Sequence, residues 1–183
     1  ERATARTRSL TDGFDRSVND LQWSTDGTTI YFNAEDRGAL PLFATGASGA
    51  TATPRPVTPG MFDGEFSVAA TGSLIVARSS LAAPAELYAI ERDGRARQVT
   101  RHNADLLASL DLAKPESFTF KGAGGTEVQG FLVRPPAFDA STKYPVLMLL
   151  HGGPQTQWGD TWSFRWNAQM FASPGYVVVM INR

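Results

Sequence analysis

The stretch Tyr144-Pro145-Val146-Leu147-Met148-Leu149-Leu150-His151-Gly152-Gly153-Pro154 decides the fold of this chain. Its first half is a short apolar run that is entered through a proline, and such a run is typical of a parallel strand buried on both faces. Two glycines follow the run after a single histidine. A backbone that turns sharply and presents its N–H groups is best built from residues that have no Cβ. The stretch therefore predicts a central strand over 144–150, followed by a turn that can bind a reacting oxygen.

The tetrapeptide His151-Gly152-Gly153-Pro154 has two interpretations. As one half of an oxyanion hole, it matches the HGG-type loop that follows the third strand of α/β-hydrolases and supplies one backbone N–H. As an ordinary glycine turn with a structural histidine, it carries no chemistry, because glycine pairs mark turns in many folds. The sequence that follows the tetrapeptide favours the first interpretation.

Residues 155–183 indicate a loop, a helix and a second strand, in that order. Ser163 or Thr161 can cap the start of the helix, and Pro174-Gly175 ends it before the apolar run 176–181. Three residues keep helical spacing in this segment: Phe164, Ala168 and Phe171. A strand, a crossover helix and a second strand make the βαβ unit of a parallel sheet.

These residues resemble the prolyl oligopeptidase family of serine peptidases. The likeness rests on His151-Gly152-Gly153-Pro154, on the tryptophan-rich loop after it and on Arg165-Trp166-Asn167, which are similar to the acylaminoacyl peptidase and bacterial dipeptidyl peptidase branch. That family joins an N-terminal β-propeller to a C-terminal α/β-hydrolase domain. The resemblance covers essentially the whole chain. It implies all-β propeller blades with a connection over 1–112 and the first strands and helix of an α/β-hydrolase domain over 113–183.

Composition excludes several classes of function. The 183 residues include 17 Lys and Arg against 18 Asp and Glu, without a sustained basic block, so we expect no nucleic-acid partner. There is no cysteine, and two histidines are too few for a zinc site, so we expect no metal and no cofactor. The apolar runs are all shorter than the roughly 20 residues that span a bilayer, which excludes a membrane segment.

Residues 1–112 carry an internal repeat. The segment 23–34 is echoed by 66–77, which starts 43 positions later, and Val57-Thr58 recurs as Val99-Thr100. Leu42-Phe43-Ala44 recurs in the same way as Leu87-Tyr88-Ala89. Periods of about 40 to 45 residues are typical of propeller blades, and Asp-Gly pairs at 26–27 and 93–94 are hairpin turns.

About two blades therefore fit before residue 101. Because a propeller closes with typically 4 to 8 blades, most of the ring is expected upstream of this segment. The alternative is an unrelated β-rich domain with coincidental spacing. The chain begins at Glu1 without the apolar stretch of a signal peptide, so we expect a processed, truncated or fragmentary chain.

The connection and the start of the second domain follow from local patterns. Residues 101–116 are polar and mildly helical, and Lys114-Pro115 breaks that pattern. Residues 117–121 alternate as a strand, the glycine-rich segment 122–125 turns the chain, and 127–133 returns as the partner strand. An antiparallel hairpin is thus predicted to open the hydrolase sheet.

No catalytic triad is present in the sequence. A serine hydrolase needs a nucleophile on a strained turn, a histidine and a carboxylate, yet Gly-x-Ser-x-Gly does not occur in these residues. His151 precedes any nucleophile elbow, whereas the catalytic histidine of α/β-hydrolases follows it, so a structural role is favoured for His151. The family resemblance places the elbow, the acid and the histidine beyond residue 183. We therefore predict a companion segment or chain that carries the Ser, Asp and His of the triad.

The remaining site candidates surround this loop. The N–H of Gly153, or else of Gly152, is expected to face the substrate carbonyl oxygen, with His151 and Pro154 shaping the loop. Other branches of the family place a tyrosine at the start of the loop, so its side-chain contribution is not expected here. Trp158 is the candidate for lining a substrate pocket, with packing as the alternative. Glu35 and Arg37 are candidates for binding a peptide amine in the propeller cavity, with surface charge as the alternative.

The sequence thus predicts part of a serine peptidase that cleaves short peptides, of the dipeptidyl peptidase or acylaminoacyl peptidase type, by hydrolysis of an acyl-enzyme. This segment supplies the oxyanion loop, lacks the triad and is expected to be inactive alone. The alternatives are an esterase-like α/β-hydrolase and a non-catalytic propeller interaction module. The resemblance implies a peptide substrate and a periplasmic or secreted protein, with a cytoplasmic location as the alternative. A homo-oligomer stays open.

Overall fold

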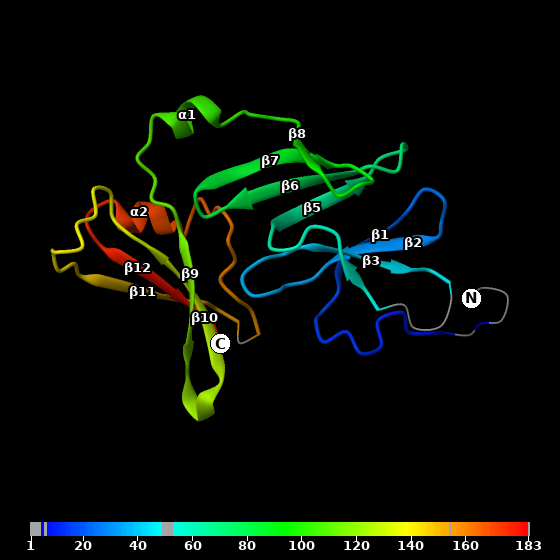
Figure 1. Cartoon of the computed structure of the whole chain (residues 1–183), viewed down its shortest axis with the longest axis horizontal. Helices are drawn as coiled ribbons and strands as arrows, with labels where there is room; N and C mark the ends of the chain where they lie inside the picture. Colours follow the sequence, from blue (N-terminus) through cyan, green and yellow to red (C-terminus); the bar gives the residue numbers. More distant parts are fainter. Residues whose placement is uncertain (1–4, 6, 49–52, 154, 183) are drawn as a thin grey trace.

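The computed structural model describes residues 5, 7–48, 53–153 and 155–182. Within these residues, twelve strands form three four-stranded sheets (Figure 1). Two sheets are consecutive antiparallel meanders, and the third mixes parallel and antiparallel pairs. No helix in these parts of the chain is long and apolar enough to span a bilayer.

The first meander joins its strands in chain order, each antiparallel to the next. A tight turn at Asp26-Gly27 links the first two strands, and Gly27 has a positive φ of 69°, which glycine adopts without strain. The four strands are β1 (Asn19–Trp23), β2 (Thr29–Asn33), β3 (Leu42–Gly46) and β4 (Arg55–Pro56).

The second meander repeats this order and pairing. Its last two strands are joined by the turn at Asp93-Gly94, where Gly94 has a φ of 84°. The strands are β5 (Phe62–Val68), β6 (Leu74–Ser80), β7 (Ala83–Ile90) and β8 (Ala96–Gln98). The prediction of two four-stranded blades is therefore confirmed, and we call these meanders the first and second blade.

The sequence repeat Val-Thr has a structural counterpart in both blades. In the first blade, the N–H of Val57 donates to the Leu42 carbonyl at 2.7 Å, and the Thr58 hydroxyl accepts from the Leu42 N–H at 2.9 Å. In the second blade, Val99-Thr100 makes the same two bonds with Leu87, at 2.7 and 2.8 Å. The repeat therefore produces the same pair of hydrogen bonds in each blade. These bonds fix the end of the fourth strand to the third strand.

The two blades pack through a shared core. Between them are the buried side chains Leu42, Phe66, Leu74, Val76 and Ile90. Gln22 in β1 also bridges the blades: its amide donates to the Phe66 carbonyl at 2.6 Å and accepts from the Val68 N–H at 3.2 Å. These bonds occupy backbone groups on the free edge of β5, so the blades form one unit.

A buried glutamate anchors the connection that follows the second blade. Glu86 is 8% exposed and accepts two hydrogen bonds from Asn103, each 2.9 Å long, in addition to one from the Thr100 hydroxyl. The Thr100 bond, which is the largest cause, lowers the pKa of Glu86 to about 2. The predicted helix in this connection is the short α1 (Ala104–Ala108).

The third sheet has the strand order β11-β12-β10-β9. β9 (Glu116–Lys121) and β10 (Glu127–Val133) form the predicted hairpin, which turns through the 3-10 segment Ala123–Gly125. β11 (Val146–Leu150) lies parallel to β12 (Val177–Ile181) after the crossover helix α2 (Ala168–Ala172). The βαβ unit is therefore confirmed. The domain boundary at 112/113 remains a prediction.

The core of the third sheet includes one residue from the second blade. Its buried side chains are Leu81, Phe131, Val133, Ala168, Ala172, Val178 and Met180. Leu81 belongs to the hairpin between β6 and β7 and is 6% exposed. Burying such a side chain contributes roughly 1.5–3 kcal/mol. The second blade and the third sheet are therefore held together by apolar packing.

The expectation of a central strand buried on both faces is wrong for β11 in this structure. Its exposure alternates, and Val146, Met148 and Leu150 are 62, 56 and 76% exposed. The cause is that only one face of this edge strand, which pairs with β12 alone, is covered by other elements among the described residues. One face packs through Leu149 against the core, and the other face has no covering layer among the described residues.

The predicted start of the helix is also wrong. α2 begins at Ala168, because the side chain of Asn167 accepts hydrogen bonds from the Gln169 and Met170 N–H groups. The Ser163 hydroxyl accepts from two N–H groups in a preceding turn, and Thr161 contacts Ser79 instead. Phe164 is consequently 89% exposed and does not share the buried face of the helix.

Candidate functional site

The His-Gly-Gly loop starts where β11 ends, at the carboxyl edge of the parallel pair β11–β12. Gly153 has a φ of 110°, a conformation that side-chain-bearing residues rarely adopt. A Cβ at this position would overlap the Thr156 side chain. Both facts make glycine necessary at position 153.

Gly152 differs from its neighbour. It has no positive φ, and an added Cβ would meet no atom within 4 Å. Both glycines are exposed, so their N–H groups lie at the protein surface. Pro154, the last residue predicted to shape the loop, lies outside the described residues.

The ring of His151 contacts its own loop. Its Nδ1 lies 2.9 Å from the Gly152 carbonyl oxygen. Because a carbonyl oxygen only accepts, Nδ1 carries the proton in this contact, and a neutral ring leaves its lone pair on Nε2. The imidazole of His151 is thus hydrogen-bonded to the carbonyl of the next residue in the turn.

An open apolar hollow of about 690 Å³ lies beside this loop. Trp158 contributes one wall, and its indole Nε1–H donates to the Leu149 carbonyl at 3.0 Å. The other lining residues are Met148, Leu149, Leu150, His151, Gly152, Thr156, Gln157 and Trp166. The structure therefore brings the candidate pocket residue Trp158 next to the glycine loop.

Asn182 fixes the backbone of Trp158, a role that sequence reasoning did not find. Its Oδ1 accepts from the Trp158 N–H at 2.6 Å, and its Nδ2 donates to the Trp158 carbonyl at 2.9 Å. A third bond, 2.6 Å long, joins Nδ2 to the Gln129 side chain. The residue is 5% exposed, and the only sequence signal was an amide that directly follows an apolar strand.

The other two predicted site residues lie in the connection between β2 and β3. Glu35 and Arg37 are both exposed, and Arg37 has a positive φ of 52°. Arg37 lines a separate hollow of about 240 Å³ together with Gln129, Gln157 and Asn182. The structure thus places Arg37 near the segment that follows the glycine loop, while Glu35 is exposed on the same connection.

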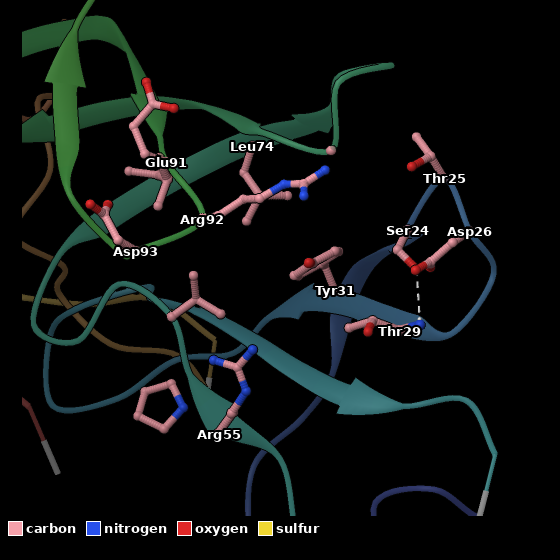
Figure 2. A pocket seen from close by; sticks show the side chains of 15 residues that line it. Ser24, Thr25, Asp26, Thr29, Tyr31, Arg55, Leu74, Glu91, Arg92 and Asp93 are labelled. Atoms are coloured by element: carbon pink, nitrogen blue, oxygen red, sulfur yellow. Dashed lines mark hydrogen bonds between the residues drawn. The ribbon is translucent and has the colours of Figure 1, made fainter.

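A further cleft of about 490 Å³ lies between the two blades (Figure 2). Arg55 and Arg92 line it with the aromatic Tyr31. Two of the acids at its rim are hydrogen-bonded within their own turns. Ser24 and Thr28 bond to Asp26 and lower its pKa to about 2, and the Arg95 N–H lowers the pKa of Asp93. Its turns lie at the opposite ends of β6 and β7 from the hairpin that meets the third sheet, away from the glycine loop.

No protein-family model matches the chain. Dipeptidyl-peptidase 5 of Porphyromonas gingivalis is 33% identical over 183 residues, which is 99% of this chain and 26% of that protein. Dipeptidyl-peptidase 5 of Trichophyton schoenleinii is 33% identical over 181 residues, or 94% and 24%. The chain thus spans about a quarter of the length of the curated relatives it matches.

Solved structures show the same arrangement of sheets. An acylaminoacyl peptidase in complex with Z-Gly-Gly-Phe-chloromethyl ketone matches with a TM-score of 0.81 and 25% identity, covering 97% of this chain and 27% of that one. The acylaminoacyl peptidase of Pyrococcus horikoshii matches with a TM-score of 0.79 and 26% identity, covering 97% and 26%. The likeness therefore extends over both blades and the third sheet together.

Proposed function

We propose that this chain, which is related to the prolyl oligopeptidase family of peptidases, supplies one backbone donor of the oxyanion hole in a serine peptidase that cleaves short peptides. The resemblance first indicated by the His-Gly-Gly-Pro loop is confirmed by the dipeptidyl-peptidase 5 and acylaminoacyl peptidase relatives. Because these relatives are about four times longer, the activity of the whole protein is the proposal.

The geometry of Gly153 carries this proposal. Open parallel sheets bind their ligands outside the carboxyl ends of their strands, and the glycine loop starts at such an end. The positive φ of Gly153 turns the exposed backbone here, beside a hollow that can hold a substrate group. A backbone N–H in this place can donate to the oxygen that becomes negative during acyl transfer.

The proposed reaction is acyl transfer from a short peptide to a serine, followed by hydrolysis of the acyl-enzyme. In this scheme the N–H of Gly153, rather than that of Gly152, stabilises the tetrahedral intermediate. His151 holds the loop through its contact with the Gly152 carbonyl and transfers no proton. An oxyanion loop alone does not distinguish amides from esters, and the peptidase names of the relatives favour the amide.

The hollow and the blade loop are proposed to contact the substrate. Trp158 presents a fixed indole in an apolar hollow, which suits an apolar side chain of a peptide. Glu35 and Arg37 are exposed and charged on a blade connection that reaches the third sheet, and we assign them to the terminal charges of the peptide. Two features support this assignment. The two side chains carry charges opposite to those of the two peptide ends, and Arg37 lines a hollow together with Gln129 of β10.

The triad is proposed to come from a companion segment that covers β11 and α2. The uncovered face of β11 is apolar, and Met170 of α2 and Phe164, which precedes α2, are 71 and 89% exposed. Exposed apolar surface on this scale marks an interaction site, and an unpaired strand edge marks the place of a further strand. A segment that bears Ser, Asp and His would complete both the sheet and the site.

A labelling experiment tests the proposed function. The full-length protein that contains this segment is treated with a fluorophosphonate and then assayed on dipeptide and N-acylated amino-acid amides and on the matching esters. Covalent labelling together with amide cleavage is the expected result. Failure to label contradicts a serine hydrolase, and labelling with cleavage of esters alone contradicts a peptidase.

The family resemblance also supports export to the periplasm or the medium, because bacterial relatives with this loop are often exported. Cell fractionation with a cytoplasmic marker enzyme as control tests this location. Recovery of the full-length protein with the cytoplasmic marker would contradict it.

A further inference from the structure

The connection between β2 and β3 ends in a tight mirror-image turn that points at the third sheet. Asp36 and Ala39 exchange two backbone hydrogen bonds of 3.0 Å, and the two residues between them have φ angles of 52° and 81°. Positive φ at both central positions is the signature of a type I′ hairpin turn. Figure 1 shows this connection extending from the first blade toward β10. We call Asp36–Ala39 the blade turn.

The blade turn is hydrogen-bonded to the segment that leaves the glycine loop. The Gly38 N–H donates to Gln157 Oε1 at 2.8 Å, and Gln157 Nε2 donates to the Ala39 carbonyl at 3.1 Å. The Asp160 N–H donates to the Gly38 carbonyl at 2.6 Å. The carboxamide of Gln157 thus uses both of its polar ends on one turn, which fixes its distance and its orientation.

Close packing makes this junction stiff. A Cβ on Gly38 would lie 2.5 Å from Cζ of Phe131 in β10, so the turn has no free space on that side. A Cβ on Gly159 would overlap the ring of Phe62 in β5. A glycine therefore stands on each side of the junction, at a point where a phenylalanine ring packs directly against the backbone.

The segment 157–161 alternates its partners between the blades and the third sheet. Gln157 binds the first blade, and Trp158 binds Asn182 and the end of β11. Asp160 accepts from the Leu81 N–H of the second blade at 2.8 Å. Each blade therefore contacts the same short segment that fixes the wall of the hollow.

The glycine loop itself has few anchors. Residues Gly152, Gly153, Gln155 and Thr156 are exposed. The loop is continuous with β11 on one side and with Gln157 on the other, so these two ends determine where its N–H groups point. An exposed turn with two fixed ends loses its geometry when one end is released.

We propose that Gln157 is a positioning residue that makes the oxyanion loop depend on contact with the blade turn. This inference rests on the proposed function, since it assigns a consequence to the Gly153 N–H. The carboxamide of Gln157 is bonded to the blade turn, so this group does not act on the reacting atoms. It holds the chain four residues after Gly153, and it does so only while the blade turn lies against the third sheet. The oxyanion donor is therefore in place when the blades are docked and is released when they move away.

Three variants of the full-length protein test this coupling. Gln157→Ala removes both side-chain bonds to the blade turn. Gln157→Glu keeps an acceptor for the Gly38 N–H and loses the donor to the Ala39 carbonyl. Gln155→Ala is the matched control, because Gln155 is an exposed residue of the same loop and makes no hydrogen bond to any other described residue.

Two readouts separate this inference from the proposed function. The first is amide hydrogen exchange at Trp158 and Asp160, whose N–H groups donate to Asn182 and to the Gly38 carbonyl, and this readout needs no activity. We expect Gln157→Ala to raise exchange here at least about tenfold, Gln157→Glu to raise it less, and β10 and β12 to stay protected. The second is steady-state kinetics on the substrate that the enzyme cleaves. Because small displacements of a catalytic group cost up to about 10²-fold, we expect kcat to fall about 10- to 100-fold with little change in KM.

The outcomes decide between the two claims. Raised exchange in Gln157→Ala with unchanged exchange in Gln155→Ala supports the coupling, even where the protein does not label with a fluorophosphonate and the proposed function fails. Equal exchange in these two variants overturns the coupling. Raised exchange with an unchanged kcat in an active enzyme overturns the positioning role of Gln157.

Discussion

The two sides of the third sheet differ in how completely they are covered. On one face, Val133, Val178 and Met180 are fully buried, and Leu81 of the second blade packs against them. On the opposite face, at the edge strand β11, alternate residues are more than half exposed. Both sides belong to one sheet with similar apolar composition, so the partner and not the sequence of each strand decides its burial.

This contrast distinguishes a face of the third sheet that the described residues cover from a face that they leave exposed. The blade-facing side is closed by hydrogen bonds and packing within the described residues, and it positions the segment 157–161. On the β11 side, the described residues leave an apolar face and the glycine loop exposed. The Gly153 N–H, the proposed oxyanion donor, therefore lies between a face that is covered and a face that is exposed.

The largest expected effect comes from the glycine loop at this boundary. Gly153→Val in the full-length enzyme places a β-branched residue at a φ of 110° and against Thr156, so the N–H moves away from the oxyanion. We expect kcat to fall about 10²- to 10³-fold, while KM changes little. Steady-state kinetics checks this result. Gly152→Ala, which meets open space, is expected to cost far less; an unchanged kcat in Gly153→Val would remove the oxyanion assignment.

The closed side is tested by Leu81→Ala. The substitution leaves a cavity between the second blade and the third sheet, and we expect the free energy of unfolding to fall by about 2–4 kcal/mol. Urea unfolding followed by tryptophan fluorescence measures it. Leu106→Ala, at a position that is 61% exposed, is the control and is expected to change little. Equal losses in both variants would show that the blade does not stabilise the sheet through Leu81.

The anchor between the second blade and the connection gives a pH dependence. The pKa of Glu86 is lowered to about 2 in the folded protein, chiefly by the Thr100 hydroxyl, from a usual value of 4.5. A lowered folded-state pKa stabilises the protein above about pH 5, and this contribution is lost as the pH falls toward 2. We expect Glu86→Gln to lower Tm at pH 7 and the difference from the unmodified protein to shrink between pH 5 and pH 2.

Thermal unfolding across this pH range measures the difference, with Glu127→Gln at an exposed position as the control. A Tm difference that stays constant from pH 7 to pH 2 would contradict the role of the ionised Glu86 carboxylate. Such a result would leave the blade-facing interface dependent on apolar packing.

The smallest effect on stability is expected on the open side. Met148 is 56% exposed on β11, so Met148→Lys in the isolated chain should change the free energy of unfolding by less than about 0.5 kcal/mol. It should also reduce self-association, because a charge interrupts an exposed apolar edge strand. Sedimentation velocity measures the association. Stronger association of the variant, or a large loss of stability, would show that β11 is already covered.

Much of the fold followed from local sequence signals. The Asp-Gly turns and the Val-Thr repeat predicted two blades, and the structure shows the same hydrogen bonds at Thr58 and Thr100. The glycine-rich turn at 122–125 predicted the β9–β10 hairpin. Such signals work because a turn or a strand-end bond is decided by a few neighbouring residues.

The errors had a different origin. The burial of β11 depends on elements far from it, and an apolar run reads the same whether or not its partners are present. The start of α2 depended on whether Ser163, Thr161 or Asn167 captures the first N–H groups, and Asn167 does so. The roles of Gln157 and Asn182 were not predicted, because a single amide in a loop gives no pattern until the fold brings its partners together.

The central claim is that the Gly153 N–H donates to the oxyanion. The most direct measurement is the amide proton shift of Gly153 in the full-length enzyme labelled with ¹⁵N-glycine, before and after a peptide boronate forms a tetrahedral adduct with the active-site serine. A hydrogen bond to the negative oxygen predicts a downfield shift of Gly153 that is larger than that of Gly152. An unshifted Gly153 amide in a formed adduct would contradict the account.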